Sequence, residues 1–188
     1  PTTHKEGRVR KKLLLASATA ALGASAFAPT PDAKPKEKKP DHEVSSKLGV
    51  ASEYRYRGIS QSRLEPAVSG GADYTHNPTG LYAGTWASSI KWINDAGGGN
   101  KNIEVDLYAG KKGELVKGVS YDIGGLYYWY PSNNLSTSAN TFELYGKLSY
   151  GPAYVKYSHS LTNLFGFADS KNSGYLDVGA DIDMGSGY

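Results

Sequence analysis

From residue 45 onward, apolar and polar side chains alternate with a period of two, and no other feature of the chain constrains its fold as strongly. Ile103, Val105 and Leu107, for example, are separated by two acidic residues. Because successive side chains of a strand point to opposite faces of a sheet, this spacing places the charges on one face and the aliphatic residues on the other. The pattern recurs in eight runs and predicts an all-β chain.

The connections between these runs alternate in length, long then short, along the whole chain. In order they are 58–65, 76–79, 93–102, 112–117, 131–140, 151–152, 162–172 and 185–187. Long loops at one end of the strands and short turns at the other are typical of outer-membrane barrels. A soluble sheet with one wet face shares the alternation of side chains, but a Greek-key sandwich has no reason to alternate its loop lengths. We therefore expect an antiparallel up-and-down transmembrane β-barrel of at least eight strands.

Aromatic residues gather at both predicted ends of the strands, as in the girdles that flank the apolar band of such barrels. The long-loop set is Tyr56, Trp92, Trp129, Tyr130 and Tyr175, and the short-turn set is Tyr74, Tyr82, Tyr121, Tyr150 and Tyr154.

The N-terminal part of the chain has the order of a secretory signal. A basic run at 8–12 precedes the apolar stretch 13–22, and small residues follow with A-x-A sites that end at Ala26 and Ala28. Of these we favour Ala26, because Pro29 directly follows Ala28. Residues 29–44 are rich in Pro and Lys and hold too few large apolar side chains to form a core. We expect a signal peptide over 1–28, a disordered tether over 29–44 and the barrel over 45–188.

Seven short blocks then stand in the order known from one bacterial family. They are 51–62 (ASEYRYRGISQS), 80–86 (GLYAGTW), 104–110 (EVDLYAG), 127–131 (YYWYP), 143–146 (ELYG), 157–160 (YSHS) and 174–177 (GYLD). Over residues 48–188 the chain resembles the TorF-type porin family of proteobacteria, also called the Gcw family. The resemblance implies a Gram-negative outer-membrane barrel and a transport channel. Members of that family continue beyond the point that corresponds to Tyr188, so we expect the barrel to be incomplete here, with its first and eighth strands unpaired.

Charge and residue types argue against several other functions. Five basic residues and one acidic residue precede residue 29, whereas 16 basic and 17 acidic residues follow, so the predicted folded part lacks the basic excess of a nucleic-acid binder. The chain has no Cys. Ser158 and His159 are neighbours in a predicted strand, so their side chains point to opposite faces and cannot form a catalytic pair in the usual way. We expect no enzyme activity, no cofactor and no metal site.

The remaining candidate is the predicted lumen, where four basic and nine acidic side chains face inward. These are Glu53, Arg55, Arg57, Asp73, Glu104, Asp106, Asp122, Glu143, Lys147, Lys156, Asp177, Asp181 and Asp183. An acidic lumen favours cations, and we expect passive diffusion of small polar solutes with that preference. Arg55 and Arg57 could instead form a bracing ion-pair network with Glu53 and Asp73.

A second hypothesis is a non-conducting structural or adhesive barrel that binds partners through its long outer loops. Under both hypotheses the protein contacts outer-membrane lipid; the sequence does not predict its oligomeric state.

Overall fold

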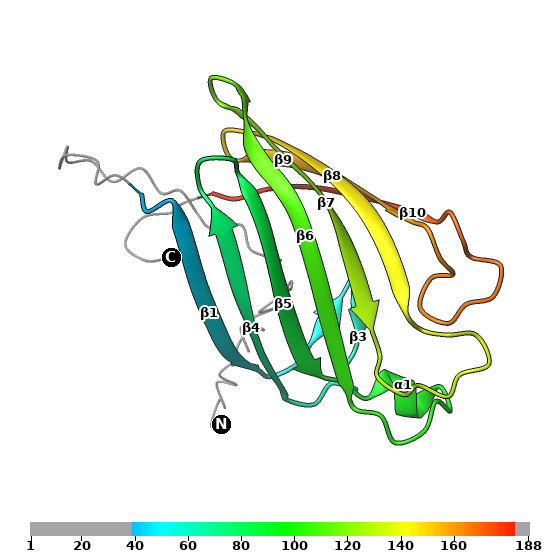
Figure 1. Cartoon of the computed structure of the whole chain (residues 1–188). Helices are drawn as coiled ribbons and strands as arrows, with labels where there is room; N and C mark the ends of the chain where they lie inside the picture. The colour runs from blue at the N-terminus through cyan, green and yellow to red at the C-terminus, as the bar shows by residue number, and fades with distance from the viewer. Residues whose placement is uncertain (1–38, 183–188) are drawn as a thin grey trace, which may run out of the picture.

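A computed structural model describes residues 39–182 and contains one antiparallel sheet of eight strands, each paired with its neighbour along the chain (Figure 1). In sheet order the strands are β1 (His42–Ala51), β4 (Ala67–His76), β5 (Leu81–Ser89), β6 (Ile103–Val116), β7 (Val119–Trp129), β8 (Thr141–Tyr150), β9 (Ala153–Ser160) and β10 (Gly174–Ala180). The predicted all-β, up-and-down order of eight strands is confirmed.

The predicted alternation of connection lengths is also confirmed. Long connections span 52–66, 90–102, 130–140 and 161–173, and short turns span 77–80, 117–118 and 151–152. The long connections lie together at one end of the sheet and the short turns at the other (Figure 1). The first two long connections also contain short elements, namely β2 (Arg55–Tyr56), β3 (Ile59–Ser60) and α1 (Trp92–Asp95). Among residues 39–182 no helix has the length and apolar character that a membrane crossing requires.

Two predicted boundaries at the start of the sheet were wrong. The run 45–57 is not one strand, because β1 ends at Ala51 and the chain then turns toward the inside of the curved sheet. At the other end, β1 begins at His42, so residues 42–44 belong to the first strand although composition had assigned them to the tether. Pairing with β4 explains this, since His42 lies opposite His76 and Val44 opposite Tyr74.

The two faces of the sheet differ sharply in character. Large aliphatic side chains cover the convex face, where Val50 is 75% exposed and Ile123 53% exposed, and no second sheet covers them within the described residues. Leu144 and Val178 are also exposed there, whereas Val105 is half-buried. Charged and hydroxylated side chains fill the concave face, so the usual placement of apolar residues inside and polar residues outside is inverted.

The buried residues form a small cluster at the long-loop end of the concave face. Tyrosines contribute most of its large side chains, and its members are Tyr54, Ala67, Ile90, Ile93, Tyr108, Leu126, Tyr128, Tyr130 and Ala139. A cluster this small, with so many hydroxyl groups, depends on hydrogen bonds as well as on apolar contact.

Glycines permit the tight curvature of the central strands. A Cβ added at Gly110 would overlap the Ile123 carbonyl oxygen and the Tyr82 side chain, and one at Gly124 would lie 2.6 Å from the Ala109 carbonyl oxygen. Tyrosine rings lie across these glycines from the neighbouring strand, so the missing side chain of one residue is replaced by the ring of another.

The sheet has two free edges. Within the described residues no ladder joins β1 to β10, so the outer backbone groups of both strands lack a strand partner. The expected lack of pairing between the first and eighth strands is confirmed.

Candidate functional site on the concave face

Residues 52–66, which we call the inner loop, form one side of the candidate site. A small hairpin lies at its centre, where Arg55 pairs with Ser60 and Tyr56 with Ile59. The two connecting residues, Arg57 and Gly58, have φ angles of 48° and 81°. Two consecutive positive φ angles are characteristic of the tight type I′ turn, and glycine adopts such an angle without strain. The hairpin directs the side chains of Tyr56 and Arg57 toward the opposite wall, as the contacts below show.

Tyr54 anchors the first half of the inner loop. Its hydroxyl donates a hydrogen bond of 2.8 Å to Oε1 of Glu104 on β6, and its ring meets Trp86 edge-on at 5.3 Å between centroids. The backbone amide of Gln61 donates to the Tyr54 carbonyl, which holds the loop's two arms together. Burial, together with the negative charges of Glu104 and Asp106, raises the pKa of Tyr54 far above its ordinary value. The hydroxyl therefore stays protonated and remains a donor.

Arg57 anchors the second half. Its Nη1 and Nη2 atoms donate to Oε1 and Oε2 of Glu143 on β8 at 2.9 and 2.8 Å, which is a bidentate pair. The guanidinium lies 4.2 Å from the ring centroid of Tyr175 on β10. Beside it, the hydroxyl groups of Tyr56 and Tyr128 form a hydrogen bond with each other. Burial lowers the pKa of Arg57, but the bond to Glu143 and the nearby tyrosines outweigh it and raise that pKa overall. The inner loop is therefore tied to β8 by a permanent charge.

Two acidic residues lie beside these anchors, next to the buried cluster. Glu104 and Asp106 are 2% and 3% exposed. Glu104 accepts the hydrogen bond from Tyr54, whereas Oδ1 of Asp106 has no hydrogen-bond partner. Neither forms an ion pair within the described residues, so this end of the concave face carries uncompensated negative charge when both are ionised.

A second group of charges crosses the concave face nearer the short turns. Strand register aligns Lys112, Asp122, Lys147, Lys156 and Asp177 across five adjacent strands. Two of these lysines form cation-π contacts with tyrosines: Nζ of Lys147 lies 4.0 Å from the ring centroid of Tyr154, and Nζ of Lys156 lies 4.4 Å from that of Tyr145. The Tyr82 hydroxyl donates to Asp122 at 2.5 Å. This row is less buried than the anchors and is the more open part of the site.

Most of the predicted lumen residues lie on the concave face. The set comprises Arg57, Asp73, Glu104, Asp106, Asp122, Glu143, Lys147, Lys156 and Asp177. Glu53 and Arg55 instead pair with each other in the inner loop at 2.9 Å, and Asp181 follows the end of β10 in an exposed position. Asp183 lies outside the described residues.

The proposed ion-pair partners were only partly right. Arg55 does pair with Glu53, but Arg57 pairs with Glu143 and not with Asp73. Asp73 instead forms an ion pair with Lys47 on β1, with 3.2 Å between Nζ and Oδ2, and its Oδ1 accepts a hydrogen bond from the Tyr108 hydroxyl.

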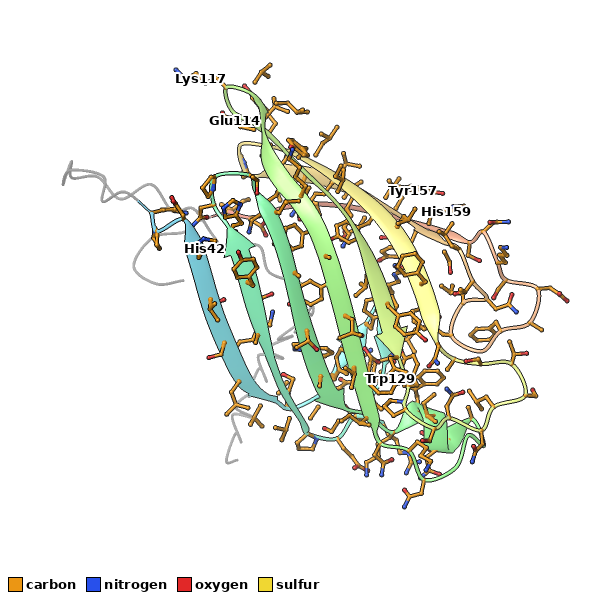
Figure 2. The ribbon with its side chains drawn as sticks, viewed as in Figure 1. His42, Glu114, Lys117, Trp129, Tyr157 and His159 are labelled. Atoms are coloured by element: carbon orange, nitrogen blue, oxygen red, sulfur yellow. The ribbon has the colours of Figure 1, made fainter. Side chains whose placement is uncertain are left out.

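Tyrosines are the functional residues that the sequence pattern misplaced. A period of two continued through residue 57 would place Tyr54 and Tyr56 on the apolar outer face, but both lie inside. The Arg57-Gly58 turn is the sequence signal that marks this break. The two girdles are therefore wrong in part: Tyr82, Tyr130 and Tyr154 also contact inward-facing acidic residues. Trp129, Tyr74 and Tyr150 remain exposed on the convex face, with Trp129 near the long-loop end of β7 (Figure 2).

The described residues contain no group of three or more His, Asp or Glu side chains placed to hold a metal ion. The geometry is that of a polar, tyrosine-rich surface whose long-loop end is contacted by the inner loop. Such a surface can hydrogen-bond and attract small polar molecules by charge.

Comparison with known families gives one match. The model of a family described as "Bacterial protein of unknown function (Gcw_chp)" matches residues 35–187. No curated protein and no solved structure matches the chain significantly. The Gcw part of the resemblance is confirmed, while the family description names no channel.

Proposed function

The chain belongs to the Gcw_chp family of bacterial proteins of unknown function, and from the geometry of its sheet we propose that it forms the wall of an outer-membrane β-barrel through which small polar solutes diffuse passively. The observation that carries this proposal is the inverted placement of side chains. Exposed aliphatic residues cover the convex face, and buried carboxylates lie on the concave one. In water such a surface would drive aggregation, whereas in a bilayer its outer face meets hydrocarbon.

Two further features support a membrane barrel. The long connections share one end of the strands and the short turns the other, as in outer-membrane proteins. The free edges of β1 and β10 must also be paired, with each other or with further strands, because unpaired backbone groups cost several kcal/mol each in hydrocarbon.

Diffusion would follow the concave face. The more open row holds Asp122 and Asp177 beside three lysines, and the carboxyl groups of Glu104 and Asp106 are buried at the long-loop end. We propose a preference for cations that requires this buried acidic pair to be ionised, because the row itself holds three lysines against two aspartates. The inner loop lies on the concave face at the long-loop end of this path, where it is bonded to β6 and β8.

The inner loop also favours a second candidate function. Tyr54 and Arg57 tie it to two different strands, so it could close the pathway completely. The protein would then be a non-conducting structural or adhesive barrel that acts through its long outer connections.

Conductance in planar bilayers separates the two functions. The full-length protein is compared with Arg57→Ser, which frees the inner loop from Glu143, and with Arg55→Ser as the matched control. A passive channel gives ohmic steps in the wild type and larger steps in Arg57→Ser only. A closed barrel conducts only after Arg57→Ser. Absence of conductance in the wild type and in both variants would contradict the diffusion pathway.

Cell fractionation tests the barrel itself. The protein should be recovered with outer membranes and should migrate differently on gels before and after heating. Recovery as a soluble periplasmic or secreted protein would instead support a soluble sheet.

A further inference from the structure

Two histidines face each other at the short-turn end of the sheet, away from the concave site. His42 is the first residue of β1 and His76 the last of β4, and the two are direct partners in the antiparallel ladder. Both lie on the same face as Val44 and Tyr74, and Figure 2 shows His42 at this end of β1. Their ring centroids are 5.0 Å apart, with 34° between the ring planes.

Each imidazole is already held by its Nδ1 atom. Nδ1 of His42 lies 2.8 Å from the Tyr74 hydroxyl, and Nδ1 of His76 lies 2.7 Å from Oγ1 of Thr79. Tyr74 also stacks on His42 at 6.0 Å between centroids. When Nδ1–H donates to an oxygen, Nε2 carries the lone pair, and no described residue forms a hydrogen bond with either Nε2. A hydrogen bond from the other ring nitrogen is the arrangement that orients histidine ligands of metal ions.

The separation of the rings suits a shared ion. A transition-metal ion about 2.0–2.1 Å from each Nε2, at a roughly tetrahedral angle, places the two ring centroids about 5 Å apart. Imidazole nitrogen is a preferred ligand of divalent zinc, nickel and copper. His42 is exposed and His76 half-buried, and both lie at the short-turn ends of their strands, where a membrane barrel meets water, so water can complete the coordination of an ion held by two protein ligands.

We propose that His42 and His76 bind a divalent transition-metal ion that clamps the start of β1 to the end of β4. β1 is an edge strand, and among the described strands only β4 pairs with it. An ion that binds only the paired state stabilises this end of the ladder by mass action. The site is separate from the concave face and does not depend on the proposed channel.

The test uses the full chain in detergent, freed of metal and titrated calorimetrically with Zn²⁺ alone. One binding event is expected, and His42→Gln and His76→Gln should each weaken it at least about tenfold. His159→Gln is the matched control, because His159 on β9 also contacts a tyrosine but faces Leu144 and Gly174 across the strands. Tyr74→Phe removes the support of one ring and should weaken binding by roughly tenfold with both ligands retained.

Electron paramagnetic resonance of the wild-type protein with bound Cu²⁺ gives a second readout, which requires no substitution. Coupling to two equivalent imidazole nitrogens supports the clamp. The proposal is overturned if only one nitrogen couples, if His42→Gln and His76→Gln bind Zn²⁺ like the wild type, or if His159→Gln weakens binding as much as they do.

Discussion

Arg55 and Arg57 are two residues apart in the inner loop, and each pairs with one carboxylate. Their surroundings differ, since the side chains of Arg55 and Glu53 are 46% and 21% exposed, whereas those of Arg57 and Glu143 are 14% and 3% exposed. Exposed pairs contribute about 0–1 kcal/mol because water screens them. Removing one partner of a buried pair costs about 3–5 kcal/mol, because the other charge is left without compensation.

Replacement of these arginines should therefore have unequal effects. Arg57→Leu should lower the free energy of unfolding by about 3–5 kcal/mol, and Arg55→Leu by less than about 1 kcal/mol. Urea titration in detergent micelles measures both. In the double variant Arg57→Leu/Glu143→Leu part of the loss should return, since no buried charge remains. Equal effects of Arg55→Leu and Arg57→Leu would show that the inner loop is not anchored by Glu143.

Individual strands owe their curvature to paired glycines and tyrosines. Tyr82 from β5 covers Gly110 on β6, and Tyr145 from β8 covers Gly124 on β7. In both cases a neighbouring carbonyl oxygen also approaches the glycine closely. By contrast, the nearest atom to a Cβ built on Gly146 of β8 is a methyl group of Ile123 at 3.9 Å.

A pair of alanine substitutions tests this account of the curvature. Gly110→Ala should destabilise the protein by about 1–3 kcal/mol or prevent its folding, because the added methyl group displaces both the β7 backbone and the Tyr82 ring. Gly146→Ala should leave the free energy of unfolding nearly unchanged. Far-ultraviolet circular dichroism and the urea midpoint report the difference; similar stability of the two variants would contradict it.

The same elements explain what the sequence could predict. Eight runs and their loop alternation were readable, because a period of two extends through β4 to β10 with the charges on one side, Lys111 of β6 being an exception. The inner loop could not be predicted, because residues 52–57 continue the alternation although the Arg57-Gly58 turn reverses the chain. Partners such as Lys47 for Asp73 depend on the register between strands, which a single sequence does not contain.

On the scale of the whole molecule, the described residues form a curved sheet whose polar side is concave and whose apolar side is convex and exposed. Its buried cluster, centred on Tyr54, Tyr108 and Tyr128, is small for a chain of this length. The central claim of the proposed function is that hydrocarbon covers the convex face, because this would remove its aliphatic side chains from water.

Fluorescence quenching along β7 tests that claim most directly. The chain has no Cys, so single cysteines at positions 120–123, 126 and 127, which leave the two crowded glycines of β7 unchanged, can each carry a fluorophore in protein reconstituted into liposomes. Lipids brominated in their tails should quench odd positions such as Ile123 strongly and even positions such as Asp122 weakly, with a period of two. Quenching without that alternation, or protein that remains in the aqueous phase, would contradict a membrane-facing convex surface.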